Sequence, residues 1–448
     1  MPTVVDEDAV TLAYRGLDNT VRKTIIVCSL KPSDLTASRA RFELTLRPKE
    51  TVNLDVTIQC VEPAIVPTLA VSYEHGFAEA CREPNLITSE ATRVSTSNEE
   101  FDNWIRRSAS DLQMMIAGNP EKCYPYAGVP WFSTVFGRDG LITAFECLWL
   151  YPDIAKGVLK YLAETQATGV DSRSDAEPGK ILHETRRGEM AALGEIPFAR
   201  YYGSVDATPL FVMLAGAYYE RTADLIFIRS IWPGIQLALQ WIESYGDADG
   251  DGFVEYSRTS ENGLVQQGWK DSNDSIFHAD GTLAQGPIAL SEVQGYVYAA
   301  WLRAAELSGV LGDDQQAESF RLRAATLKRD FERAFWCDDI STYALALDGR
   351  KEPCRVGTSN AGHCLFAGIA EEGRAHRVAL RSAGPDFFSG WGIRTVSSGE
   401  YRYNPMSYHN GSVWPHDNAM IACGLANYGF KEAVLQILKG LFDAKHLP

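Results

Sequence analysis

The sequence predicts a mostly helical protein, a toroid of paired helices preceded by part of an antiparallel β-sandwich. Residues 9–75 alternate apolar and polar side chains with the period of two that is typical of strands. From residue 98 onward the period becomes helical, and apolar faces recur on eleven segments that follow one another in hairpin-like pairs. This number fits an (α/α)6 toroid, with six inner and six outer helices, that lacks its last helix. An α-solenoid is the less favoured alternative, because no fixed sequence period is visible.

The β domain is expected over residues 1–75, with strands at 9–16, 22–27, 40–46 and 51–58. Segments rich in Pro, Gly, Asp and Asn separate these strands, as turns require. Four strands with few apolar positions make a thin core, so we expect this domain to be a fragment of a longer one. Residues 76–97 have mixed polarity and are expected to form a linker.

The helical domain is expected over residues 98–448. Asp206 and Asp313 are expected to cap helices, and Ser412 precedes a helix that it can cap. Long polar segments at 167–204, 246–286 and 336–359 alternate with the helix pairs and are expected to form loops around a cleft. The predicted helices are 99–117, 140–150, 153–166, 206–220, 222–245, 288–307, 313–335, 360–370, 373–383, 413–428 and 430–444.

Charge and motif content narrow the class of function. The net charge of −16 disfavours nucleic acid and anionic membranes as partners. No signal peptide opens the chain, no apolar stretch is long enough for a bilayer, and nine scattered cysteines fit reduced thiols in a cytoplasm. The sequence also has no phosphate-binding glycine loop and no serine hydrolase elbow. We therefore expect a cytoplasmic protein without a cofactor.

Four turn-rich segments between helices share an unusual composition: 136–139, 181–189, 266–275 and 408–417. They gather aromatic rings, carboxylates, Arg and His. Sugar rings stack on aromatic faces, charged and amide groups bind sugar hydroxyls, and the glycosidic oxygen needs a carboxylic acid to protonate it. These segments therefore predict a sugar-cleaving cleft.

Asp271 is the first candidate for the general acid. It follows Trp269, and a carboxyl beside an indole is partly desolvated, which favours its protonated form. The alternative is a turn aspartate that bonds the backbone near Asn273. Asp274 is expected to be a second member of the site, although it fits a turn or cap role at least as well.

The other candidate residues are expected to bind substrate. Arg138 and Asp139 either grip sugar hydroxyls or, for Asp139, cap a helix, with Trp131 and Phe132 as stacking surfaces nearby. His183 and Glu184 lack the second histidine of a zinc motif, so no metal site is predicted there.

Glu292 lies on an apolar helix, where a charge needs either a site role or an ion pair. The segment that holds His409, Trp414 and Asp417 either contacts sugar or packs a helix entry.

An acidic loop at Asp247, Asp249 and Asp251 begins like an EF-hand calcium loop. Its twelfth position is Arg258, where a bidentate glutamate is needed, and the flanking helix pair is absent. A turn is therefore predicted, with a weak structural Ca²⁺ site as the alternative.

Taken in order, these motifs resemble the amylo-α-1,6-glucosidase type of bacterial and archaeal glycogen debranching enzymes over about residues 98–444. The resemblance implies an (α/α)6 barrel, inversion at an α-glucosidic bond and Asp271 as the general acid. It also implies a glutamate base after the helix at 430–444, which places the base beyond Pro448. Either the chain is truncated or the base is recruited from elsewhere. The resemblance is carried by Trp131, the segments 136–140, 181–184, 247–253, 268–272, 292–296 and 408–417.

The sequence therefore predicts an inverting α-glucosidase that acts on α-1,6 branches or related bonds of α-glucans or α-glucosides. A non-catalytic carbohydrate-binding toroid is the first alternative. A glycoside phosphorylase is the second, with Lys270, Arg186 and Arg187 as candidates for its phosphate site.

Overall fold

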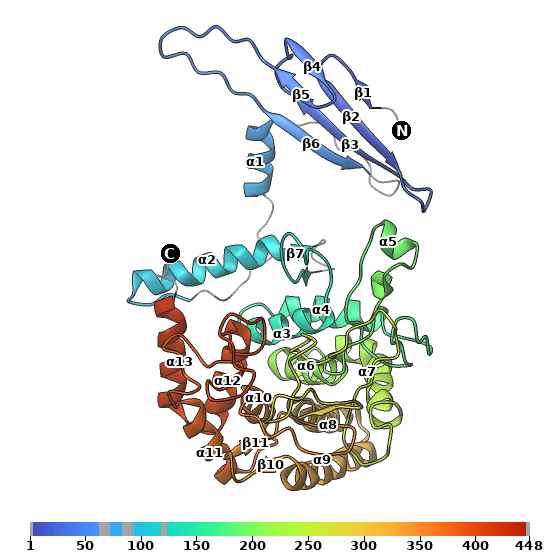
Figure 1. The fold of residues 1–448 in the computed structure, drawn as a ribbon, viewed down its shortest axis with the longest axis vertical. Coiled ribbons are helices and arrows are strands. Elements are labelled where there is room, and N and C mark those ends of the chain that lie inside the picture. Colours follow the sequence, from blue (N-terminus) through green and yellow to red (C-terminus); the bar gives the residue numbers. More distant parts are fainter. Residues whose placement is uncertain (1–2, 62–71, 83–91, 93, 118–122, 445–448) are drawn as a thin grey trace. The chain divides into compact units, whose positions relative to one another are not determined.

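The computed structural model describes residues 3–61, 72–82, 92, 94–117 and 123–444 (Figure 1). The chain divides into two compact units. One contains Met1–Glu90 together with Arg187–Ala199, and the other contains Ala91–Arg186 and Arg200–Pro448.

The first unit is built on a four-stranded antiparallel sheet in the order β1-β2-β3-β6. Strand β2 pairs with β3 from Ala9↔Val27 to Arg15↔Val21. Residues 187–199 belong to this unit because Glu189 accepts hydrogen bonds from the Tyr14 hydroxyl at 3.1 Å and the Leu17 N–H at 2.6 Å. Its elements are β1 (Val4–Val5), β2 (Ala9–Arg15), β3 (Val21–Cys28), β4 (Asp34–Thr36), β5 (Arg39–Arg41), β6 (Val56–Val61), α1 (Tyr73–Arg82), α5 (Glu189–Ala192) and the short 3-10 turn Pro197–Ala199.

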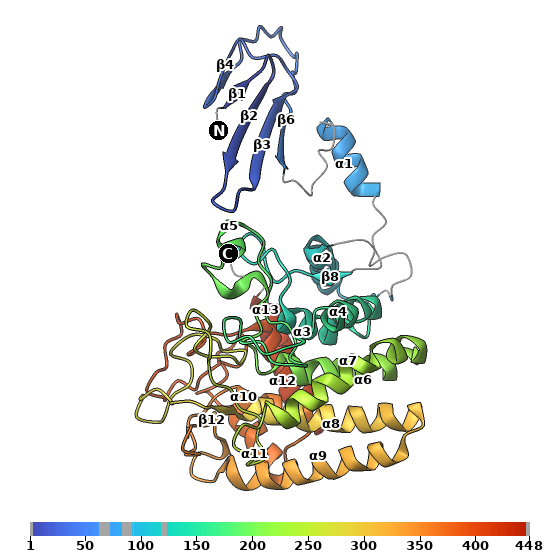
Figure 2. The same cartoon turned by 90° about the vertical axis from the view of Figure 1, so that its right-hand side faces the viewer.

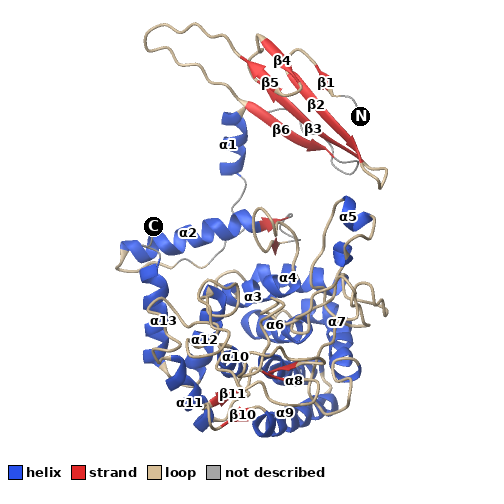
Figure 3. Ribbon diagram, viewed as in Figure 1, coloured by secondary structure: helices blue, strands red, loops and turns tan. Residues whose placement is uncertain are grey.

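The prediction of strands at 40–46 and 51–58 is wrong over residues 42–55, which form no strand (Figure 3). The chain reverses near Lys49, whose φ is 67°. The apolar side chains of this segment, Leu44, Leu46, Val52 and Leu54, are exposed. Alternating polarity favours a strand only where a partner segment can bury one face, and here none does. Helix α1 occupies part of the predicted linker.

All eleven predicted helices are present in the second unit, with ends shifted by a few residues. Ten of them pack as hairpins: α3 with α4, α6 with α7, α8 with α9, α10 with α11 and α12 with α13. Their bounds are α2 (Glu99–Met115), α3 (Gly137–Cys147), α4 (Pro152–Glu164), α6 (Ala207–Thr222), α7 (Leu225–Ser244), α8 (Ser291–Leu311), α9 (Asp314–Ala334), α10 (Asn360–Ala367), α11 (Glu372–Ser382), α12 (Pro415–Asn427) and α13 (Lys431–Ala444).

The first member of each hairpin forms an inner layer, in which α3, α6, α8, α10 and α12 contact one another in that order (Figures 1 and 2). Helices α6 and α8 are buried on nearly all sides, which suits an inner position. Helices α9 and α11 carry polar residues on one face and lie outside. The helical unit is therefore an (α/α)6-type toroid.

Local sequence explains where several helices start and stop. The side chain of Asn98 accepts from two N–H groups of α2, Asp224 caps α7, and Asp313 caps α9 as predicted. Gly312 and Gly368 end α8 and α10 in the left-handed conformation, which glycine adopts without strain. The remaining short strands are β7 (Ile116–Ala117), β8 (Tyr124–Pro125), β9 (Ala289–Leu290), β10 (Trp336–Cys337), β11 (Thr342–Tyr343) and β12 (Ala346–Leu347).

The expectation that no apolar stretch is long enough to span a bilayer is wrong when helices are judged by length and composition alone. Helix α7 has 20 residues and a mean hydropathy of 1.2 over its best window. It packs on α6 and α4 within the toroid, and 44% of that window is buried. Its apolar face is accounted for by this packing.

Close packing between the inner helices α10 and α12 depends on glycine. A Cβ added at Gly424 would collide with backbone atoms of Phe366, Leu365 and Gly362. We expect Gly424→Ala to lower the free energy of unfolding by about 1–3 kcal/mol, because backbone must move apart. Gly309→Ala is the matched control, since nothing lies within 4 Å of its added methyl. That change should raise stability by up to about 1 kcal/mol. Urea unfolding measures both, and equal effects would contradict this packing account.

Candidate active site

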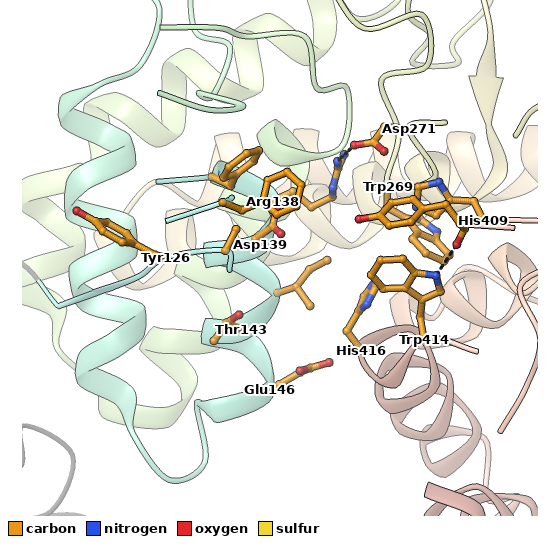
Figure 4. A pocket seen from close by; sticks show the side chains of 15 residues that line it. Tyr126, Arg138, Asp139, Thr143, Glu146, Trp269, Asp271, His409, Trp414 and His416 are labelled. Atoms are coloured by element: carbon orange, nitrogen blue, oxygen red, sulfur yellow. Dashed lines mark hydrogen bonds and ion pairs between the residues drawn. The ribbon is translucent and has the colours of Figure 1, made fainter. Parts of the chain in front are cut away.

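A cavity of ≈ 330 Å³ opens in the helical unit (Figure 4). It lies between the start of α3, the loop that carries Trp269 and Asp271, and the segment that leads into α12. Three of the four segments that the sequence singled out supply lining residues. These are Tyr126, Ala127, Phe132, Phe136, Arg138, Asp139, Ile142, Thr143, Glu146, Trp269, Asp271, Tyr408, His409, Trp414 and His416.

The start of α3 is fixed by the segment 181–189, which crosses close to it. The Gly137 N–H donates to the His183 carbonyl at 2.8 Å, and Phe136 and Glu184 form a β-bridge. A Cβ at Gly137 would collide with the Leu182 carbonyl, so only glycine permits this crossing. Helix α3 begins three residues earlier than predicted, and Arg138 and Asp139 lie in its first turn. Asp139 is therefore not a cap.

The loop that carries Asp271 is tethered on both sides of that residue. The Lys270 ammonium donates to the Thr395 carbonyl at 2.6 Å, and Ser272 Oγ lies 2.7 Å from His409 Nδ1. The Asn410 amide donates to the Asp274 carboxylate at 3.1 Å. These bonds fix the loop so that Asp271 faces the cavity, with about a third of its side chain exposed. Asp274 does not line the cavity.

One guanidinium joins two carboxylates at this site. Arg138 Nη1 lies 3.2 and 3.1 Å from the two oxygens of Asp206, and Nη2 lies 3.2 Å from Asp271 Oδ2. Asp206 is fully buried and also accepts from Ser204 Oγ at 2.6 Å. Its predicted role as a helix cap is wrong, because its side chain makes no capping bond and turns to Arg138.

Burial shifts the pKa values of the cavity acids upward. Burial raises the pKa of Asp271; the Arg138 charge opposes this shift, and the charges of Asp139 and Asp206 add to it. Burial likewise raises the pKa of Asp139, against the opposing charge of Arg138. A partly exposed carboxyl whose pKa is shifted upward is suited to act as a general acid.

Aromatic rings form one wall of the cavity. The Trp269 indole meets Trp414, His409 and His416 edge to face, with ring centroids 6.4, 5.7 and 5.1 Å apart. His409 stacks on Trp414 at 5.5 Å. Burial lowers the pKa of His409 to about 3 and that of His416 to about 4, so both rings are neutral near pH 7. The wall is therefore aromatic and uncharged, and a sugar ring can stack on such a surface.

Glu292 and Asp417 lie in a buried network behind this wall and do not line the cavity. The far face of Trp269 stacks on His363, whose Nε2 lies 2.7 Å from Asp417 Oδ1. Burial alone would raise the pKa of Asp417, but its bond to His363 and the charges of His363 and Lys270 lower it. Burial raises the pKa of Glu292, and burial lowers that of Lys270 to about 8.

Three further predicted residues lie outside the cavity lining. The Trp131 side chain is 80% exposed, while its neighbour Phe132 lines the cavity. The His183 ring is buried between Phe136 and Tyr201. Glu184 is buried and accepts from Arg186 at 3.3 Å. The predicted members that do meet at the cavity are Arg138, Asp139, Trp269, Asp271, His409 and Trp414.

Sequence reasoning missed Glu146, which lines the cavity from α3. Asp139, Thr143 and Glu146 are spaced i, i+4, i+7 and so share one helical face, which is a signal that the sequence contains. Burial raises the pKa of Glu146 to about 7, and its Oε1 atom is buried without a hydrogen-bond partner among the described residues. Tyr408 and His416 were passed over beside the named residues of their segment, and Asp206 was read only as a cap.

The acidic loop is balanced by a lysine of the same chain. Asp247, Asp249 and Asp251 offer oxygens within 4.8 Å of one another, the geometry of a cation site. The Lys351 ammonium lies 2.9 Å from Asp249, 2.8 Å from Asp251 and 2.6 Å from Glu255. This ammonium supplies the positive charge that the loop needs, so the geometry adds no support to the calcium alternative.

Comparison with known families identifies the family to which this chain belongs. The chain belongs to the family described as mannosylglycerate hydrolase MGH1-like glycoside hydrolase domain, whose model matches residues 137–447. Residues 1–57 match the N-terminal domain of (some) glycogen debranching enzymes. No curated protein matches the sequence. The predicted relationship to glycoside hydrolases is therefore confirmed.

Solved structures share the fold. A mannosylglycerate hydrolase of family GH63 from Thermus thermophilus, in complex with Tris, has 16% sequence identity and a TM-score of 0.56. The match covers 75% of this chain and 90% of that one. The same enzyme with Tris and D-glycerate gives 17% and 0.57 over the same shares. A chain described as a sialidase gives 12% and 0.57, over 79% of this chain and 30% of that one.

The raised pKa of Glu146 predicts a pH-dependent stability. The folded protein keeps this proton up to about pH 7, whereas the unfolded chain releases it near the ordinary value of 4.5. The free energy of unfolding therefore falls as pH rises between these values and stays low above them. Glu146→Gln should stabilise the protein by about 2–3 kcal/mol at pH 8 and hardly at pH 4.

Urea unfolding at the two pH values checks this expectation. Glu318→Gln, an exposed glutamate on α9, is the control and should change stability by less than about 0.5 kcal/mol at either pH. An equal effect of Glu146→Gln at pH 4 and pH 8 would mean that the carboxyl titrates normally.

Proposed function

We propose that the protein is an inverting α-glucosidase that acts on α-1,6 branches or related bonds of glycogen-like glucans or oligosaccharides. The observation that carries this proposal is Asp271, a carboxyl with a raised pKa that Arg138 holds at the edge of an aromatic-walled cavity. Membership of a glycoside hydrolase family supports the reaction class. The match of residues 1–57 to a domain of debranching enzymes supports the glucan substrate.

In the proposed reaction the Asp271 proton passes to the bridging oxygen as the bond from that oxygen to the anomeric carbon breaks. A water attacks the anomeric carbon from the opposite face, and its proton passes to a second carboxylate. In inverting enzymes the two carboxyls lie roughly 6.5–9.5 Å apart, which leaves room for the water. Glu146 is a poor base below its pKa of about 7, so we do not assign it this role.

The remaining lining residues fit substrate binding. Arg138, Asp139 and His409 bring polar groups to this lining, the half-buried Trp414 brings an aromatic ring, and the buried Trp269 packs against that ring. Glu184 and Glu292 are buried next to this set and contribute to its shape and field rather than to sugar contacts. The charge of Glu184 is coupled to those of Asp271 and Asp139, which raise its pKa.

Mannosylglycerate hydrolysis is a second candidate, favoured by the family match. Its glycerate carboxylate needs a free cation, and the charges of the cavity argue against one. Asp139, Glu146 and Asp271 are acidic, and Arg138, the only Lys or Arg among the described lining residues, is shared by two carboxylates. A neutral aglycone fits this lining better than an anion.

A phosphorylase would need a free basic residue to hold phosphate, and two of the basic residues expected for this role are bonded to other groups. Lys270 is buried against the Thr395 carbonyl, and Arg186 bonds Glu184 and the Trp131 carbonyl. Arg187 is not among the residues that line the cavity. Among the described residues that line the cavity, no uncommitted Lys or Arg could hold inorganic phosphate. A non-catalytic sugar-binding toroid would share the cavity, and the next experiment separates it from an enzyme.

Asp271→Asn should lower kcat/KM on α-1,6-linked glucosides by about 10²–10⁴-fold, because the amide cannot protonate the leaving oxygen. The kcat/KM of the same variant on a dinitrophenyl α-glucoside, whose leaving group needs no proton, should fall much less. Asp274→Asn is the matched control on the same loop and should stay near the parent rate. Released glucose is measured, with thermal unfolding to show that each variant folds. Unchanged turnover by Asp271→Asn would exclude the proposed acid.

The charge of the cavity predicts a preference between two small substrates. Glucosylglycerol should be cleaved with a kcat/KM about tenfold or more above that for glucosylglycerate at pH 7 and low salt. Added salt should narrow the difference, since it screens repulsion between the carboxylates and the anion. The opposite preference, or a preference that salt leaves untouched, would favour an anionic substrate.

A further inference from the structure

The bond between Arg138 and Asp271 poses a problem for proton donation. A guanidinium within hydrogen-bond distance of a carboxyl favours its ionised form. A general acid must instead hold its proton until the substrate is bound. Arg138 is 7% exposed and lies 3.2 Å from Asp271, so solvent does little to screen this attraction.

The geometry around Asp206 offers a solution. This carboxylate faces both of its oxygens to Arg138 Nη1, and Ser204 Oγ holds it in place. It has no exposed surface, it does not line the cavity, and it does not cap the helix that it precedes. Its contacts therefore point to Arg138 as its functional partner.

We propose that Asp206 is a positioning residue, which anchors Arg138 and offsets its charge so that Arg138 can hold Asp271 in place without favouring the ionised form of that acid. This inference rests on the proposed role of Asp271 as the acid. Without Asp206, Arg138 would be a buried cation whose only ion-pair partner among the described residues is the acid itself. With Asp206, the acid faces a nearly neutral pair.

The electrostatics of Asp271 agree with this role. Burial raises its pKa most, Arg138 lowers it, and Asp139 and Asp206 raise it. Glu184 also couples to Asp271 from the crossing segment, and Tyr408 couples to it from the segment before α12. Those other groups remain in place when Asp206 alone is changed, so the effect of its charge can be isolated.

The first test is the pH dependence of kcat/KM on an α-1,6-linked glucoside. Asp206→Asn leaves the Arg138 charge without its offset, so the basic limb should move down by about 1 pH unit or more. Asp206→Glu keeps the charge and should restore most of the limb. Ser204→Ala removes a bond to Asp206 but no charge, and should leave the limb where it is. A limb that does not move in Asp206→Asn overturns the proposal.

A second readout does not need turnover. Carboxyl carbon-13 NMR of aspartate-labelled protein identifies the Asp271 signal by its loss in Asp271→Asn. Its midpoint should fall in Asp206→Asn and return close to the parent value in the double variant Arg138→Gln/Asp206→Asn, which removes the cation as well. The double variant also serves if Asp206→Asn does not fold. A midpoint in the double variant that lies far from the parent value, or as low as that of Asp206→Asn, would overturn the charge argument.

The two readouts separate this inference from the proposed function. Midpoints that shift as expected, in a protein whose turnover does not need Asp271, would leave the Asp206 arrangement standing and remove the acid role. Midpoints that stay constant, in a protein that does need Asp271, would do the reverse.

Discussion

The candidate site depends on one guanidinium placed between two carboxylates. Arg138 reaches Asp206 at the start of one inner helix and Asp271 on the following long loop, from the first turn of another inner helix. A buried guanidinium is costly unless it is paired, so these three side chains must come together for the core to close. The same requirement that stabilises the ring thus brings an acid to the cavity edge.

Most of the fold could be predicted from the sequence because its helices are long and strongly periodic. The predicted segments at 313–335 and 430–444 match α9 and α13 almost residue for residue. Failures occurred where a pattern needed a partner that sequence cannot show. The alternating residues 42–55 form no strand, and the acidic loop binds Lys351, which lies far along the chain.

The candidate site was predicted in outline but not in depth. Loop residues with exposed chemistry, such as Asp271 and His409, were found because their composition does not suit helix or strand. Asp417 was placed among the sugar contacts, yet it lies behind the aromatic wall, because successive side chains of helix α12 are turned by about 100°. His416 therefore lines the cavity while Asp417 is buried. Asp206 was predicted only as a helix cap because it stands at the start of a helix, and its partner Arg138 lies far away in the sequence.

The most direct measurement is a crystal structure of Asp271→Asn soaked with an uncleaved α-1,6-linked disaccharide. The account predicts that the introduced amide lies within about 3.2 Å of the bridging oxygen, with the terminal ring against Trp269 or Trp414. A bridging oxygen that instead rests against Glu146 or Asp139, with residue 271 turned away from it, would contradict the account.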